Sequence, residues 1–267
     1  MRQVRQPAVA GMFYPADPKE LEVQVSGFLA DARQRVRGTS SDGMTKAVIA
    51  PHAGYIYSGP IAGSAYAAVA ARADAIHRVV LLGPAHRMGF AGIAFSRAEQ
   101  FATPLGVVDV DRASLDAIAD LPQVHAMDQA FDGEHCLEVQ LPFLQALLGS
   151  FTVVPLLVSD ADTDDVAEVL ERLWGGDETL IVISSDLSHY LDYESARAID
   201  TRTSEAICSL RPDAITTHQA CGRNPIAGLL HEAARRGLKA ELLDLRSSGD
   251  TAGPRDRVVG YGAYVFH

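Results

Sequence analysis

Three apolar stretches of the sequence end in polar clusters that carry histidine. His52 follows the run in VIAPHAG, His86 follows the run in VVLLGPAH, and Asp186 and His189 follow the run in IVISSDLSH. If these runs are parallel strands of one sheet, their carboxyl ends lie along one edge, where ligand sites form in the crevice beyond the strands. The pattern therefore predicts that the three clusters meet in one site.

Cys221 is a fourth candidate, in the segment HQACGRNPIAGLL. Pro225 suits the first turn of a helix, and Cys221 stands just ahead of it. A thiolate near a helix N-terminus is stabilised by the helix dipole and is the form that binds metal. The two imidazoles of His52 and His86 with this thiolate would make a three-ligand metal site with open positions, as in catalytic zinc and non-haem iron proteins.

Plainer interpretations of these residues stay open. A histidine after a strand is often a hydrogen-bonded loop residue, and a single cysteine is more often a small buried hydrophobe. His135 and Glu138, in DGEHCLEVQLPF, could share one helix face with Asp132 or Glu134 orienting them, or could belong to a capped helix start. Tyr55 and Tyr57 could line a pocket or only pack. The remaining histidines lack such a context and are expected at the surface or in packing: His77, His125, His218, His231 and His267.

The elements that would position these residues alternate along the chain. Short apolar runs indicate strands at 46–50, 78–82, 151–158, 180–184, 242–245 and 258–266. Helical patterns follow most of them, including one at 60–73, and a first helix capped by Asp17 is expected to run to about Arg35. A loop is expected at 38–43, and another at 247–256 between the last two strands. Alternating strands and helices predict an α/β domain with a largely parallel central sheet flanked by helices.

The segment IAPHAGYIYSG shows how His52 would be presented. Pro51 should end the strand because it lacks an N–H donor. Gly54 should permit a tight turn that aims His52 at the crevice. Ser58 and Pro60 should then start the next helix.

Composition narrows the function classes. A chain of 267 residues with 48% hydrophobic residues can bury the core of a single domain, expected to span 1–267. The net charge of −11 argues against nucleic acid as a partner, since that needs a basic face. Neither a membrane-length apolar stretch nor a signal peptide is evident, and three cysteines suit a reducing compartment, so a cytoplasmic protein is expected. Phosphate-loop, dinucleotide, hydrolase-elbow, zincin and CxxC motifs are absent from the sequence.

Nine motifs, in order along nearly the whole chain, resemble the Memo-like family, known in prokaryotes as AmmeMemoRadiSam system protein B. They are AGMFYP, APHAGYIYSG, LLGPAH, FATPLG, EHCLEVQLPF, VVPLLV, SSDLSHY, CGRNPI and YGAYVF. The resemblance implies a single α/β domain similar to class III extradiol dioxygenases, with a non-haem metal at the sheet edge. It also implies AMMECR-type and radical-SAM-type proteins as functional neighbours.

The family pattern also implies roles for individual residues. The metal-binding positions fall on His52, His86 and Cys221, and the position of a general base falls on His189, with Asp186 beside it. His135, Glu138 and Tyr55 are implied as pocket residues. This chain has Cys136 where serine is usual and Asn224 where some relatives have histidine. Extradiol enzymes use a carboxylate as the third ligand, so a thiolate makes copper or zinc plausible beside iron(II).

Two functions of different class follow. The first is a metal-dependent oxidoreductase of dioxygenase type, acting on a small-molecule substrate with His189 as proton acceptor. The second is a non-catalytic module that binds a peptide or protein in the same pocket. Redox sensing through a low-pKa Cys221 thiolate is a third hypothesis.

Overall fold

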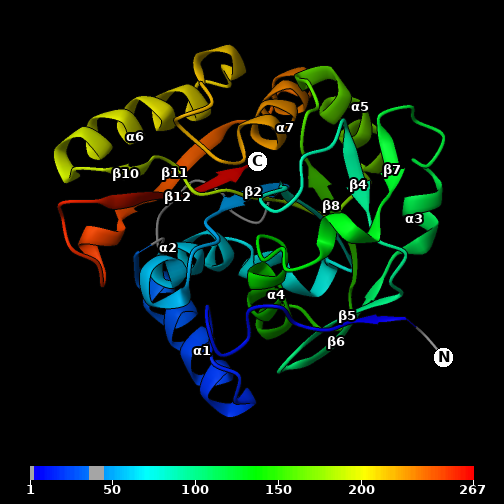
Figure 1. Cartoon of the computed structure of the whole chain (residues 1–267), viewed down its shortest axis with the longest axis horizontal. Coiled ribbons are helices and arrows are strands. Elements are labelled where there is room, and N and C mark those ends of the chain that lie inside the picture. The colour runs from blue at the N-terminus through cyan, green and yellow to red at the C-terminus, as the bar shows by residue number, and fades with distance from the viewer. Residues whose placement is uncertain (1–2, 36–44) are drawn as a thin grey trace.

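The computed structural model describes residues 3–35 and 45–267, and these form one α/β domain around a central sheet (Figure 1). The loop expected at 38–43 lies outside the described residues. Along its main path the sheet has the order β1-β5-β6-β8-β3-β9-β2-β12-β10, with β11, β4 and β7 pairing off that path. The strands are β1 Val4–Arg5, β2 Ala47–Ala50, β3 Arg78–Pro84, β4 Ile93–Phe95, β5 Gln100–Thr103, β6 Gly106–Val110, β7 Val124–Ala126, β8 Thr152–Val158, β9 Thr179–Ser184, β10 His189–Leu191, β11 Ala240–Ser247 and β12 Val258–Phe266.

The centre of the sheet is parallel, as the apolar runs predict. Strands β8, β3, β9 and β2 are neighbours in this order, and each pair is parallel. Their residues are almost all buried, because helices cover both faces. The carboxyl ends lie level, since Ala50 pairs with Ser184 and Pro84 pairs with Val158. Side chains that follow these strands are therefore brought to one edge.

Antiparallel strands extend the sheet on both sides. Strand β12 pairs antiparallel with β2, β11 and β10, and the loop between β11 and β12 falls where it was expected. Strands β1, β4, β5, β6, β7 and β10 were not predicted. They are short, and the three-residue strands offer too few positions for a periodic pattern to show.

Helices lie on both faces of the sheet, with α5, α6 and α7 on one side and α1, α2 and α4 on the other (Figure 1). The helices are α1 Pro18–Arg35, α2 Tyr55–Ala67, α3 Arg112–Asp116, α4 Leu141–Leu147, α5 Thr163–Leu173, α6 Tyr193–Cys208 and α7 Arg223–Arg235, with 3-10 turns η1 Ala70–Ala75, η2 Asp128–Phe131, η3 Glu138–Gln140, η4 Pro212–Ala214 and η5 Ser248–Asp250. Helix α1 begins as predicted, because the Asp17 carboxylate accepts hydrogen bonds from the N–H groups of Lys19 and Glu20.

The helix expected at 60–73 is shifted toward the N-terminus. Helix α2 begins at Tyr55, because the Gly54 carbonyl already accepts hydrogen bonds from the N–H groups of Tyr57 and Ser58. Pro60 therefore lies inside the helix rather than at its start, and 70–75 is a separate 3-10 turn. The role expected for Gly54 is also wrong: its φ of −56° is one that any residue adopts.

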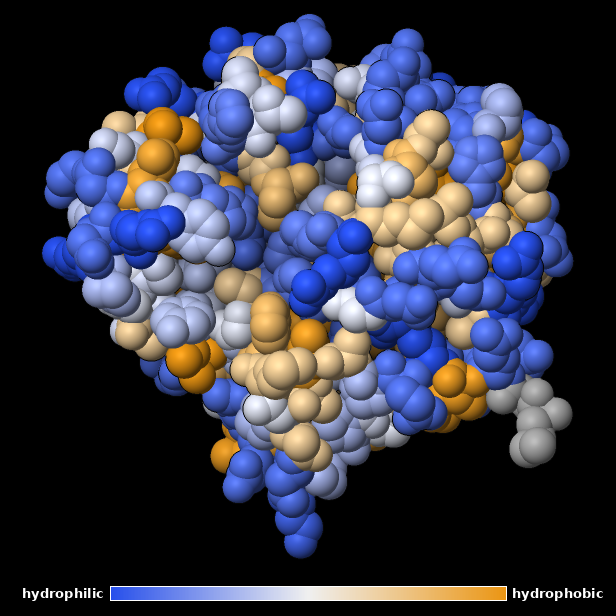
Figure 2. Space-filling model, in the orientation of Figure 1, coloured by the Kyte–Doolittle hydropathy of each residue, from blue (hydrophilic) through white to orange (hydrophobic). Residues whose placement is uncertain are grey.

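Hydrophilic residues predominate on the face shown in Figure 2, and apolar residues there form separate patches. This agrees with an apolar core enclosed between the sheet and the two layers of helices. No described helix has both the length and the apolar composition needed to cross a membrane.

Candidate metal site at the carboxyl edge of the sheet

Three imidazoles meet just beyond the carboxyl ends of the central strands. His52 follows β2, His86 follows β3, and His135 lies in the turn before η3. Their ring centroids are 4.9 to 5.5 Å apart, and one ligand nitrogen of each lies within 4.8 Å of the other two. The predicted convergence of His52 and His86 is thus found. His135, expected only as a pocket residue, belongs to the same cluster.

Hydrogen bonds settle which nitrogen of His52 is free. The Ser184 hydroxyl donates its one proton to the Cys136 carbonyl at 2.6 Å, and Ser184 Oγ accepts from Gln140 Nε2 at 2.8 Å. Toward His52 Nδ1, at 3.0 Å, Ser184 Oγ can therefore only accept. Nδ1 carries the proton, and Nε2 presents its lone pair to the cluster.

Gln140 is itself held in one orientation. Its Oε1 accepts from the Tyr66 hydroxyl at 2.8 Å, and its Nε2 also donates to the Pro51 carbonyl at 3.0 Å. Burial, together with the neighbouring His86 and His135, lowers the pKa of His52 well below its usual value. His52 is therefore a neutral imidazole with a fixed tautomer, the form that binds metal.

Glu134 performs the same task for His86. Its carboxylate lies 3.0 Å from His86 Nδ1 and accepts the backbone N–H groups of His86, His135 and Cys136. Burial disfavours the charged form of Glu134, but the hydrogen bonds from His135 and His86 outweigh it and hold its pKa well below the usual range. An ionised Glu134 needs a proton on His86 Nδ1, so Nε2 of His86 is also free to bind a metal. Glu134 was expected to orient His135 and Glu138; it accepts the backbone N–H of His135, and the imidazole that it orients is that of His86.

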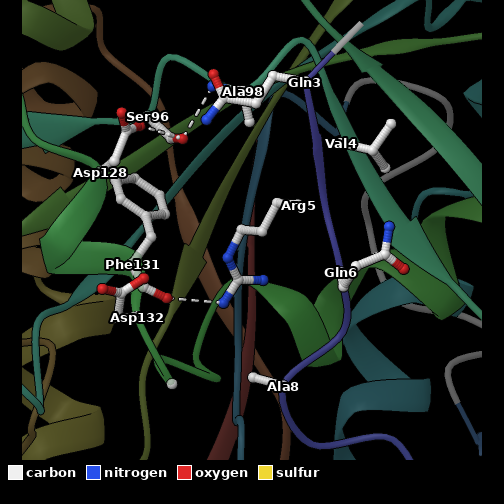
Figure 3. Close-up of a pocket in the computed structure, with 11 residues that line it drawn as sticks. Gln3, Val4, Arg5, Gln6, Ala8, Ser96, Ala98, Asp128, Phe131 and Asp132 are labelled. Carbon is white, nitrogen blue, oxygen red and sulfur yellow. Dashed lines mark hydrogen bonds between the residues drawn. The ribbon is translucent and has the colours of Figure 1, made fainter. Parts of the chain in front are cut away.

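Arg5 supports the turn that carries Glu134 and His135. Its guanidinium donates to the carbonyls of Phe131 and Glu134 at 3.0 and 2.6 Å, and Figure 3 shows the side chain extending from the N-terminal strand toward this turn. The small cavity drawn in Figure 3, about 280 Å³, lies beside that contact. Because the Arg5 guanidinium donates to these two carbonyls, we infer that Arg5 stabilises the turn.

Cys221 reaches the site beside His52. Its Sγ lies 3.3 Å from His52 Nε2, two residues ahead of α7, but it does not belong to the group of ligand atoms that lie within 4.8 Å of one another. Burial and the Asp186 carboxylate raise the pKa of the Cys221 thiol to about 12. The expected low-pKa thiolate is therefore wrong for the protein's own groups, because burial outweighs the helix dipole. A bound cation would have to supply the positive charge that favours the thiolate.

A second group of ligand atoms, from His86, Glu134 and Cys136, is also close enough to share an ion. Its members are already engaged: the Glu134 oxygens accept the N–H groups named above, and the fully buried Cys136 thiol donates to the Pro84 carbonyl at 3.2 Å. In the imidazole group, His52 and His86 each have only Nδ1 engaged by a buried polar partner, and the Cys221 Sγ is the neighbour of His52 Nε2. We therefore take His52, His86 and His135 as the better metal site, with Cys221 adjacent.

Asp186 and His189 come to the same place, as predicted. Asp186 accepts the His52 N–H at 2.7 Å, and its second oxygen lies 4.0 Å from His52 Nε2. Burial raises the pKa of Asp186, although the hydrogen bond from the His52 N–H and the neighbouring His189 imidazole oppose this. His189 lies in β10 rather than in a loop, because this short segment pairs with β12.

Glu138 and Tyr55 do not line the site, which corrects two expectations. The buried Glu138 carboxylate accepts hydrogen bonds from the N–H groups of Ala8 and Val9 and from the Tyr14 hydroxyl. It points to the N-terminal segment because η3 begins only at Glu138 and a turn at 136–137 separates it from His135, so His135 and Glu138 share no helix face. The Tyr55 hydroxyl donates to the Val139 carbonyl within the core, and Tyr57 faces the cavity instead.

A cavity of about 650 Å³ opens over the imidazoles. His52, His86, His135, Asp186 and His189 all line it. Its other walls are mostly apolar or aromatic and include Met12, Phe13, Tyr57, Tyr190, Val259 and Tyr261. A few polar groups in an apolar cleft are typical of a small-molecule site.

An α/β protein with clustered imidazoles at the carboxyl edge of its sheet is the class that the fold and the site define. The family model described as Memo-like protein matches residues 5–265. MEMO1 family proteins of Aeropyrum pernix, Archaeoglobus fulgidus and Nitrosopumilus maritimus are 38%, 35% and 32% identical to this chain, each over 98% of it and 99% of their own length. The chain therefore belongs to the Memo-like family, which confirms the prediction made from its motifs.

Proposed function

We propose that this protein is a metal-dependent oxidoreductase of dioxygenase type, with iron(II) at the imidazole cluster and a small-molecule substrate in the cavity above it. The observation that carries the proposal is the fixed tautomer of His52 and His86. A buried network through Ser184 and a part-buried contact with Glu134 place a proton on each Nδ1 and leave each Nε2 without one. Such outer partners are characteristic of histidines that bind metal.

The remaining residues of the cavity fit the proposal. Imidazole donors suit iron, copper and zinc, and a nearby thiolate would shift the preference among them. Iron(II) bound here would supply the redox chemistry of dioxygen. His189 lines the cavity without a position in the cluster, so its imidazole can accept a proton from a substrate. Asp186, hydrogen-bonded to the His52 backbone, keeps the loop after β9 against the loop after β2.

The test is metal content followed by turnover. We expect the protein purified without chelators to hold one metal ion per chain, and we expect His52→Ala and His86→Ala to lose it. Comparing the metal content of His135→Ala with that of Cys221→Ser identifies the third ligand, because the variant that loses the metal lacks it. His231→Ala, at a half-exposed histidine on α7, is the matched control. After anaerobic iron(II) reconstitution, oxygen uptake with a panel of catechols and other chelating acids should depend on His189. Failure to retain metal, or absence of uptake across the panel, would contradict the proposal.

The exposed side chains at the cavity mouth favour a second candidate, a module that binds a peptide. Met12 and Tyr190 are 72% and 64% exposed, although both line the cavity. Large exposed apolar side chains at a cleft are typical of partner-binding surfaces. Peptide binding that persists unchanged in His52→Ala and Cys221→Ser would support this function over the first.

A further inference from the structure

Two arginines carry positive charge at the wall of the cavity. Arg87 and Arg257 both line the cavity above the imidazoles. Arg87 Nε donates to the Gly133 carbonyl at 3.3 Å, and the Arg257 guanidinium lies 5.2 Å from the centroid of the Tyr190 ring. Neither is ion-paired with a carboxylate in the part of the chain that the structure describes.

The chain as a whole is acidic, with 34 acidic and 23 basic residues. Several arginines elsewhere pair with acids, as Arg5 does with Glu138, Arg78 with Glu178 and Arg172 with Asp120. Among the described residues that line the cavity, Asp186 is the only carboxylate, and it is hydrogen-bonded to the His52 backbone. The cavity wall therefore offers two guanidinium groups with donors left for a ligand, in a protein that is acidic overall.

The backbone at Tyr190 gives a second, independent observation. Tyr190 has a φ of +59°, a conformation that side-chain-bearing residues rarely adopt. It lies at the irregularity of the β10–β12 ladder, where His189 pairs with Val259 and Leu191 pairs with Val258. Such irregularities redirect a side chain, and backbone strain of this kind gathers at ligand sites. Here the strained residue holds an exposed aromatic ring against Arg257 and over the cavity.

We propose that the cavity takes a small organic acid with an apolar body. The carboxylate would bind the guanidinium groups of Arg257 and Arg87, whose planar donors match a carboxylate. The apolar body would lie against Phe13, Tyr57 and Tyr261, with the Tyr190 ring as its cover. This inference rests on the proposed function, because it assigns the substrate class of the same site.

The experiment compares phenylacetate with its neutral counterpart phenylacetamide by titration calorimetry or ligand-observed NMR. We expect phenylacetate to bind about tenfold more tightly, as one charge-assisted contact predicts. Arg257→Gln and Arg87→Gln should each reduce that preference severalfold and leave phenylacetamide binding unchanged. Arg202→Gln, at an exposed arginine on α6, is the control and should change neither. Tyr190→Gly, which suits the positive φ, should weaken both ligands and keep the preference for the acid.

Each measurement is made with zinc present and again with a chelator. If the preference for phenylacetate disappears with the chelator but remains in both arginine variants, the carboxylate binds the metal instead of the arginines. This result would overturn the proposal. Equal binding of acid and amide by the wild-type protein would overturn it as well. Because binding needs no turnover, a chain that prefers the acid but shows no oxygen uptake contradicts the proposed function alone.

Discussion

The two ends of the central sheet both carry buried polar groups beside a cavity, but they use their hydrogen bonds differently. At the amino end, Lys46 Nζ donates to the carbonyls of Gly175, Gly176 and Thr179 at 3.5, 2.7 and 3.0 Å. At the carboxyl end, Nδ1 of His52 and of His86 is engaged, while each Nε2 is left toward the cluster.

Cavity size alone would not separate these two regions. The cavity beside Lys46 measures about 530 Å³ and the one above the imidazoles about 650 Å³. The difference lies in the hydrogen bonds. Backbone carbonyls accept the protons of the Lys46 ammonium group, whereas Ser184 and Glu134 bind only Nδ1 of the His52 ring and of the His86 ring and do not contact Nε2. Saturated polar groups stabilise the fold, and groups held with an open position can bind a ligand.

The largest test of this comparison removes the charge of Glu134. Glu134→Gln keeps the shape but can no longer accept all of its present hydrogen bonds, so we expect metal affinity to fall by about 10- to 100-fold. Glu178→Gln, at the amino end, is the matched control: Glu178 also accepts several hydrogen bonds, including those of the Thr179 hydroxyl and the Gly176 N–H, which with Arg78 lower its pKa to about 2. Metal titration monitors both variants. Equal losses of metal affinity in the two variants would show that the metal does not bind specifically at the carboxyl end of the sheet.

The next test acts on the amino end. Lys46→Met should lower the free energy of unfolding by about 1–3 kcal/mol, because buried carbonyls lose their donor. Metal affinity should stay unchanged. Urea denaturation and metal titration of the same preparation measure both quantities. A loss of metal with little loss of stability would mean that Lys46 belongs to the functional site.

A smaller effect is expected from Ser184→Ala. It removes the acceptor for the proton on His52 Nδ1, and we expect metal affinity to fall by about tenfold. Ser204→Ala is the control, since Ser204 is also buried and hydrogen-bonded, at 2.6 Å to the Tyr264 hydroxyl. The Ser204 variant should lose stability but keep its affinity. Unchanged metal affinity in Ser184→Ala would show that the hydrogen bond to His52 Nδ1 does not support metal binding.

The smallest effect concerns Asp200, whose carboxylate accepts the N–H of Ser188 next to His189. Burial raises the pKa of Asp200 from 3.8 to about 6, although the Ser188 hydrogen bonds oppose this. Between these pH values the folded chain binds more protons than the unfolded chain, so this contribution to stability is lost as pH rises toward 6. The free energy of unfolding of Asp200→Asn, measured relative to that of the wild type, should therefore increase as pH rises from about 4 to about 6.5. Urea denaturation across that range checks this, and a pH-independent difference would contradict it.

Much of the site could be predicted, because the central strands are apolar runs that end in recognisable clusters. His52, His86, Asp186 and His189 were placed together from that pattern alone, and the structure brings them to one cavity. The short strands β1, β4 to β7 and β10 and the start of α2 were missed. The short strands form by pairing with neighbouring strands, and a hydrogen bond from the Tyr55 N–H to the Phe13 carbonyl fixes the start of α2. Neither kind of contact leaves a periodic signal in the sequence.

By itself, the sequence determined that the buried strands are parallel and hence the edge at which its histidines gather, since apolar runs must be buried and parallel strands end together. Tertiary structure alone decided which of His135 and Glu138 faces that edge, because a turn rather than a helix joins them. It also decided the tautomer of His52, which depends on Gln140 and Ser184, 44 positions apart in the chain. Hydrogen bonds between such distant residues exist only once the fold has formed.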